Sequence, residues 1–220
     1  MKRGLVIIFS GLDCSGKSTQ IDLLDNKLSK NNEKSLVFWS RGGYTSGFQK
    51  LKDILRYFIG KILPRSGKSA ERDRAFSNSF IRRIWISIAI LDLIFFYSIY
   101  LRFKYFLNFN IICDRYLMDT NIDFKLAYPN DKTDNWLLWR LLKYTAIKPD
   151  FHFVSTIPVS DSIIRSKFKF EPFPDSPETL DKRLDLYNKE LLSNGNLVHI
   201  DGMKDVNEIK KNVFNIVGIL

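Results

Sequence analysis

A lysine and a serine follow a glycine near the start of the chain, in a spacing suited to holding phosphate groups. Residues 11–18 fit the pattern G-x-x-x-x-G-K-[ST] of a phosphate-binding loop. Glycines at both ends let the backbone curl so that its N–H groups point at phosphate oxygens. Lys17 suits the β- and γ-phosphates, and the Ser18 hydroxyl suits Mg²⁺. The spacing therefore predicts binding of a nucleoside triphosphate with Mg²⁺. The expected contacts to ATP are Gly11, Asp13, Cys14, Ser15, Gly16, Lys17, Ser18 and Thr19.

A carboxylate and a guanidinium, Asp114 and Arg115, stand at the end of an apolar run farther along the chain. Phosphoryl transfer asks little covalent chemistry of a protein. It needs a strand-end Asp to hold Mg²⁺, directly or through water, and cations along the path of the transferred group. Asp114 and Arg115 suit these two roles. An Asp–Arg pair is often only a surface salt bridge, but its position after a buried strand favours a functional role.

Five short apolar or β-branched runs are candidates for the strands that position these residues. They cover residues 5–10, 35–40, 110–114, 151–156 and 197–201. Helix-length segments separate the runs, which is typical of βαβ units and a parallel sheet. The runs lack apolar–polar alternation, as expected for strands covered by helices on both faces. Ligands of such sheets bind beyond the carboxyl ends of the strands, where the loop, Arg41 and Arg115 would meet.

Length and composition are those of one globular domain. The 220 residues suffice for a substantial core, and 45% of them are hydrophobic. Two cysteines, Cys14 and Cys113, are too few for a disulfide framework, which favours free thiols and a cytoplasmic location. His152 and His199 fall on predicted strands, so we expect them to be packed or partnered rather than catalytic.

The segment between residues 49 and 83 is strongly basic. It supplies +7 of the formal net charge of +10. A positive field of this kind suits an anionic acceptor, an anionic membrane surface or nucleic acid, and a solvated helical face is the ordinary alternative. We expect no nucleic-acid partner, because no nucleic-acid-binding motif accompanies the segment and its aromatic residues have helix-like spacing.

Residues 84–101 form an almost wholly apolar segment, long enough to approach a membrane span. Asp92 lies at its centre, where a carboxylate is costly in lipid. A strand of the same sheet is expected to follow. A buried central helix or a dimer interface is therefore favoured over a membrane span, and peripheral contact with an anionic membrane surface stays open.

The order of these features resembles that of the thymidylate kinase family of P-loop nucleoside monophosphate kinases. The resemblance rests on the loop at 11–20, Arg41-Gly42-Gly43, Asp114-Arg115-Tyr116, Lys148-Pro149-Asp150, Arg165 and Ile200-Asp201. It implies a three-layer P-loop fold with a five-stranded parallel sheet, in one kinase domain over residues 1–220. It also implies ATP and Mg²⁺, transfer of the γ-phosphoryl group to a monophosphate, and a homodimer.

The resemblance also implies roles for single residues. Lys17, Asp114, Arg115 and Arg165 would be catalytic, Ser18 and Asp114 would hold the metal, and Asp13, Arg41 and Arg115 would bind the acceptor. Acceptor-side helices would cover residues 45–108 and a lid residues 161–178. Because no Arg stands among residues 12–15 of the loop, a lid cation must stabilise the transferred charge. Arg165 is the strongest candidate, ahead of Lys167 and Lys169.

Departures from the family concern the acceptor. Thymidylate kinases read thymine with a Phe and an Arg, and here Ala89 and Leu93 stand at the corresponding positions beside Asp92. After the Asp-Arg-Tyr run, Asp119 and Asp123 are four residues apart and share one helix face. They are interpreted as binding an acceptor hydroxyl or a second cation, with an ordinary helix surface or an ion pair to the basic segment as the alternatives.

The sequence therefore favours an ATP-dependent phosphotransferase acting on a small anionic acceptor, nominally dTMP. With its altered acceptor positions and apolar helix, the chain is similar to thymidylate kinase-like proteins found among surface-polysaccharide genes. A kinase acting on a sugar or glycan intermediate near the membrane is thus the first alternative. An ATP-binding regulatory module without kinase activity is the second, and the retained Arg41 and Arg115 speak against it.

Overall fold

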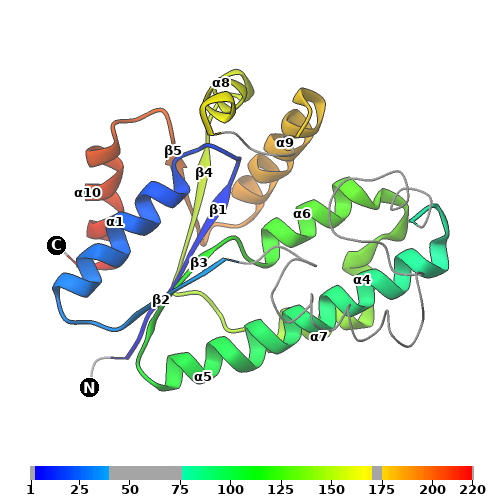
Figure 1. Cartoon of the computed structure of the whole chain (residues 1–220), viewed down its shortest axis with the longest axis horizontal. Helices are drawn as coiled ribbons and strands as arrows, with labels where there is room; N and C mark the ends of the chain where they lie inside the picture. The colour runs from blue at the N-terminus through cyan, green and yellow to red at the C-terminus, as the bar shows by residue number, and fades with distance from the viewer. Residues whose placement is uncertain (1–2, 40–75, 170–174, 220) are drawn as a thin grey trace.

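The computed structural model describes residues 3–39, 76–169 and 175–219. Arg41, most of the basic segment and part of the expected lid lie outside these residues. Within them the chain is an α/β fold in which helices flank a five-stranded, all-parallel sheet (Figure 1). The parallel sheet predicted from the sequence is confirmed.

The five strands coincide closely with the five predicted runs. They are β1 (Val6–Gly11), β2 (Ser35–Trp39), β3 (Asn110–Asp114), β4 (Phe151–Thr156) and β5 (Leu197–Asp201). Their order across the sheet is β2-β3-β1-β4-β5. The central strand β1 is buried at every residue, as expected for a strand covered on both faces. The chain adds β2 and β3 on one side of β1 and then β4 and β5 on the other. The strand order therefore reverses at β1, and sheets of this kind bind ligands at such a point.

Helices cover both faces of this sheet. α1 (Lys17–Lys30) and α10 (Val206–Val217) lie on one face (Figure 1). The other face carries α4 (Ser79–Ile94), the π-helix η2 (Phe95–Tyr100), α5 (Leu101–Phe106), α6 (Leu117–Ala127) and α7 (Leu137–Thr145). Short 3₁₀ turns, η3 (Pro129–Asp131) and η4 (Thr133–Asn135), join α6 to α7. Between β4 and β5 come α8 (Val159–Lys169) and α9 (Pro177–Ser193).

Alternate residues of β1 feed two separate apolar cores, because successive side chains of a strand point to opposite faces. Val6 and Ile8 pack in the core beneath α4, η2 and α5. Ile7 and Phe9 pack in the core beneath α1 and α10. Cys113 belongs to the first core, and both cysteines are free thiols, as predicted.

The apolar segment predicted at residues 84–101 lies within one continuous helix, Ser79–Phe106. Among the described residues this is the one helix long and apolar enough to cross a membrane by length and composition. Core helices of soluble proteins meet the same criterion, and 44% of its most apolar window is buried within the protein. Asp92 is 8% exposed, and Ile90 and Leu93 are fully buried against the sheet. The predicted burial is confirmed for the side of the helix that faces the sheet.

Candidate functional site

The loop between β1 and α1 has a backbone that requires glycine at both ends. Gly11 has a φ of 130° and Gly16 a φ of 89°, both in the region that favours glycine. A Cβ on Gly11 would stand 1.9 Å from the backbone oxygen of Ser155 on β4. Only a residue without a side chain therefore fits at position 11, where the loop leaves β1. Cys14, between the two glycines, also has a positive φ, of 60°.

Contacts from β4, α8 and the end of β5 fix the outer side of the loop. Ser155 Oγ donates a 2.8 Å hydrogen bond to the Ser15 carbonyl, and Ser162 Oγ donates one of 2.9 Å to the Asp13 carbonyl. A Cβ on Gly202 would stand 2.6 Å from the same Ser15 oxygen. The carbonyls of Asp13 and Ser15 therefore face the protein.

Helix α1 begins without a side-chain cap. Its N-cap residue is Gly16, which has no side chain to accept a hydrogen bond from the first N–H groups of the helix. The N-terminus of a helix carries a partial positive charge, and its first N–H groups need partners from outside the helix. This helix end is therefore suited to an anion that approaches over the loop.

Lys17, the first residue of α1, folds back across the loop. Its Nζ donates to the carbonyl oxygens of Gly11, at 3.1 Å, and Leu12, at 2.6 Å, and the residue is 7% exposed. Burial, and then the positive charge of Arg115, lower the pKa of Lys17 to about 8, although nearby carboxylates act in the opposite direction. A buried ammonium with a lowered pKa gains strongly from an anionic partner.

Arg115 approaches the loop from the carboxyl end of β3. It is 6% exposed, its φ of 75° lies in the left-handed region, and its backbone N–H donates to Phe9 at 2.9 Å. Nη2 pairs with Asp13 of the loop, and Nη1 lies 3.6 Å from an oxygen of Asp119. Burial opposes the charge, but Asp13 and Asp119 help raise the pKa of Arg115 well above its ordinary value. Nη1 is buried beside Asp119 and makes no hydrogen bond within the described residues.

The two predicted metal ligands, Ser18 and Asp114, lie on neighbouring elements of this site. Ser18 is exposed in the first turn of α1, and Asp114 ends β3 in register with Phe9 of β1. The charge of Asp114 acts on Lys17. Among the described residues, no group of three His, Cys, Asp or Glu side chains could hold a metal ion. The Ser18 hydroxyl and the Asp114 carboxylate are oxygen donors, the type of ligand that Mg²⁺ prefers.

Asp119 is buried at the centre of a polar network beneath the loop. Its carboxylate accepts hydrogen bonds from Ser10 Oγ at 2.5 Å, Tyr187 OH at 2.6 Å, the Tyr116 N–H at 2.9 Å and the Gly11 N–H at 3.4 Å. The residue is 1% exposed. Because both oxygens already serve the protein, we assign Asp119 to positioning the loop and Arg115 rather than to direct contact with an acceptor.

Two contacts one helical turn apart join α6 to α9. Asp119 of α6 meets Tyr187 of α9, and four residues along each helix Asp123 meets Arg183 at 2.5 Å. Arg183 is 3% exposed and also pairs with Asp175 at 3.0 Å. The predicted shared face of Asp119 and Asp123 is therefore confirmed. Among the described residues, the cation that Asp123 meets is Arg183 of α9.

Arg165 of α8 lies against the loop from the side of β5. Its guanidinium donates to the carbonyl oxygens of Cys14, at 3.3 Å, and Gly202, at 3.2 Å. Arg165, the strongest predicted lid cation, thus lies in contact with the loop. Lys167 is exposed on the same helix, and Lys169 is the last residue of that helix.

His152 is a partnered residue of β4, as predicted. Its Nε2 lies 2.8 Å from Ser10 Oγ, which donates to Asp119. Nε2 must therefore carry the proton of the neutral imidazole and donate it to Ser10. Burial lowers the pKa of His152 to about 4.

This lowered pKa predicts an acid-dependent loss of stability. The unfolded chain binds a proton at His152 below a pKa of 6.5, but the folded chain does so only below about 4. The stabilisation is complete above pH 6.5 and is lost as the pH falls towards 4. Between about pH 7 and pH 5, His152 should lower the unfolding free energy of the wild type by up to about 2 kcal/mol. A His152→Gln variant should lack this part of the decrease. Denaturant titration at both pH values measures this, with exposed His199→Gln as the control. An unchanged pH dependence in His152→Gln would contradict the prediction.

Ala89 and Leu93 are both fully buried in the core beneath α4. They pack with residues of the sheet and not against the loop. These two positions of α4 therefore do not reach a ligand held at the carboxyl ends of β1 and β3.

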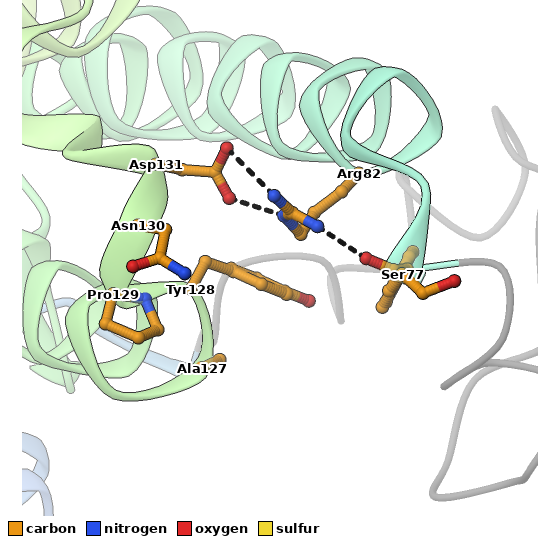
Figure 2. A pocket seen from close by; sticks show the side chains of 8 residues that line it. Ser77, Arg82, Ala127, Tyr128, Pro129, Asn130 and Asp131 are labelled. Atoms are coloured by element: carbon orange, nitrogen blue, oxygen red, sulfur yellow. Dashed lines mark hydrogen bonds and ion pairs between the residues drawn. The ribbon is translucent and has the colours of Figure 1, made fainter.

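A pocket of about 430 Å³ lies elsewhere, between the N-terminal end of α4 and residues 127–131 (Figure 2). Arg82 points into it and pairs with Asp131 through two nitrogens, while Nη1 donates to the Phe76 carbonyl at 2.6 Å. The charge of Arg82 is thereby neutralised. An anion would therefore be bound much less favourably in this pocket than at the loop.

Several residues that hold the loop in place lie outside the sequence motif and were not predicted. Ser10, Ser155, Ser162, Tyr187 and Gly202 support the loop or its neighbours. Each is distant from the loop in sequence or hidden in an ordinary strand or helix, so a pattern search gives no signal for it. No protein-family model matches the chain, and no curated protein matches it.

Proposed function

We propose that the chain is an ATP-dependent phosphotransferase with a P-loop kinase fold, most closely a nucleoside monophosphate kinase of thymidylate kinase type. The observation that carries the proposal is the convergence of two buried cations, Lys17 and Arg115, on a glycine-bounded loop at the end of the central strand. A phosphate oxygen would add a charge-assisted hydrogen bond to each of these cations.

In this proposal the loop and α1 hold the donor. The N–H groups of the loop and of the uncapped start of α1 bind the phosphate chain, and Lys17 exchanges the carbonyls of Gly11 and Leu12 for the β- and γ-phosphates. Ser18 and Asp114 hold Mg²⁺, directly or through water. When bound, the ion neutralises the charge of the phosphates.

Arg115 and Asp13 form the acceptor side. Arg115, positioned by its pairing with Asp13, supplies the positive charge for the phosphate of the acceptor. Arg41, predicted for the same role, lies outside the described residues. Arg165, already against the Cys14 carbonyl, stabilises the charge of the transferred group.

The identity of the acceptor follows less directly. The family resemblance makes dTMP the first acceptor to test. The burial of Ala89 and Leu93 favours a second candidate, a sugar or surface-glycan phosphate near a membrane, because the positions that read thymine in the family point into the core. A binding site that lacks hydrogen-bond partners for a base discriminates weakly in its favour.

ATP turnover against a panel of acceptors tests the proposal. We expect ADP formation with Mg²⁺ and dTMP to exceed formation with water alone by at least about a hundredfold. Other nucleoside monophosphates and phosphorylated sugars complete the panel, and thermal stabilisation by each compound reports binding separately. Turnover with phosphorylated sugars alone would select the second candidate. Stabilisation by ATP without transfer to any acceptor would favour a regulatory module and reject the kinase.

A further inference from the structure

The long helix formed by α4, η2 and α5 has a second apolar side, which faces away from the sheet. We call the exposed residues of this side the outer stripe: Phe80, Ile84, Leu91, Phe95, Ile99, Phe103 and Phe106, between 36% and 72% exposed. Their spacing of three, four or seven residues aligns them along one side of a helix. Soluble proteins rarely leave so continuous an apolar surface uncovered.

The π-helix η2 keeps the outer stripe straight. Leu91, Phe95, Ile99 and Phe103 are four residues apart, and in an uninterrupted α-helix such steps drift around the axis, because 3.6 residues make one turn. The i→i+5 turn of η2 holds more residues and offsets this drift. All four residues are accordingly 48% to 59% exposed, while Tyr97 between them is fully buried.

Helix α7 extends this surface. It packs beside α4 and η2, and the hydroxyl oxygens of Ser98 and Thr145 are 2.8 Å apart. Both helices cover the same apolar core, so their outer sides form one face. The exposed apolar residues that α7 adds are Leu137, Leu141 and Tyr144.

The helices of this face carry mostly positive charges, although Asp131 of the neighbouring turn η3 pairs with Arg82 and Arg83. Within residues 76–109 and 136–149, all of which the structure describes, Asp92 is the single acidic residue, and it is buried. The same residues contain seven cations, of which five are exposed: Arg83, Arg102, Arg140, Lys143 and Lys148. An apolar, aromatic-rich stripe with cations beside it has the composition of helices that lie on anionic lipid. A second copy of this chain would instead bring the same cations against one another.

We propose that the outer stripe and the outer side of α7 lie flat on an anionic lipid surface. The helix does not span the bilayer, because its other side is sealed against the sheet through Ile86, Ile90 and Leu93, all fully buried. Aromatic side chains of the stripe enter the headgroup region while the exposed cations meet lipid phosphates. The proposal goes beyond phosphoryl transfer and does not rest on it.

Sedimentation with vesicles tests this surface, using the full chain without nucleotide. One set of vesicles is phosphatidylcholine, and the other contains about one third phosphatidylglycerol. We expect at least about tenfold stronger binding to the anionic vesicles, falling as salt is added. Ile99→Glu and Phe103→Glu should each weaken this binding at least about tenfold. Both side chains are more than half exposed, so the variants should keep the wild-type thermal midpoint.

Leu192→Glu is the matched control, because Leu192 is 90% exposed on α9, away from the outer stripe. It should bind the anionic vesicles as the wild type does. Equal binding by all three variants would overturn the proposal, as would a wild type that sediments with neither set of vesicles. Light scattering identifies the rival occupant: a dimer that Ile99→Glu dissociates, without vesicle binding, would make the outer stripe an interface between copies of this chain.

Discussion

Lys17→Ala should abolish phosphoryl transfer to every acceptor, lowering kcat by at least about a thousandfold. The Nζ of Lys17 is the cation bonded across the loop, at 2.6 Å and 3.1 Å from two of its carbonyl oxygens. Without it, the charge that develops on the transferred group loses its partner within the loop. ADP formation with Mg²⁺ and ATP, measured with each acceptor and with water alone, gives the comparison.

Thermal melting separates loss of chemistry from loss of the fold. Burial lowers the pKa of Lys17 to about 8, so its charged form is held in the protein at a cost that alanine does not carry. Alanine also leaves the Gly11 and Leu12 carbonyls without this donor, so the two effects oppose each other and the variant should melt close to the wild type. Lys30→Ala, at the exposed last turn of the same helix, should turn over normally. Retained activity in Lys17→Ala would remove the proposed mechanism altogether.

Asp119→Ala should lower the free energy of unfolding by about 3–5 kcal/mol. The substitution leaves Ser10 and Tyr187 without their buried acceptor and leaves Arg115 with one carboxylate in place of two. It also removes the carboxylate that accepts from the Tyr116 N–H at the start of α6. Chemical denaturation measured by circular dichroism determines the change.

A graded set of variants separates this network from a general effect of charge. Tyr187→Phe removes one donor to Asp119 and should cost about 1 kcal/mol. Asp185→Ala removes an exposed carboxylate from the same helix, α9, and should change stability by about 0.5 kcal/mol or less. If Asp119→Ala were as mild as Asp185→Ala, Asp119 would not be the centre of the network.

The strands and the loop were predictable because their signals are local. Each strand is a short, mainly apolar run, and the lack of alternation fits the central strand β1, which is buried at every residue. The loop carries its geometry in Gly11 and Gly16, whose positive φ values few other residues tolerate. The start of α1 at Lys17 follows from the same spacing.

The support of the site was not predictable, because it joins residues that no local pattern connects. Asp119 was expected to meet an acceptor hydroxyl or a second cation, and it instead meets Tyr187, 68 residues away. The sequence showed two carboxylates on one helix face but gave no means of choosing their partner. The sequence also did not show which side of the helix at residues 84–101 is exposed. These residues are apolar on every side of the helix, so composition alone could not separate the buried side from the outer stripe.

The contacts around the loop also determine when, during synthesis, the site can exist. The motif at residues 11–18 leaves the ribosome early, yet its carbonyls and N–H groups are held by Asp119, Ser155 and Ser162, and Gly202 packs against Ser15. Pairings so distant in sequence require the closure of long loops and form late in folding. A nascent chain therefore carries the motif at residues 11–18 long before the proposed site around it is complete, because its supporting residues extend to Gly202.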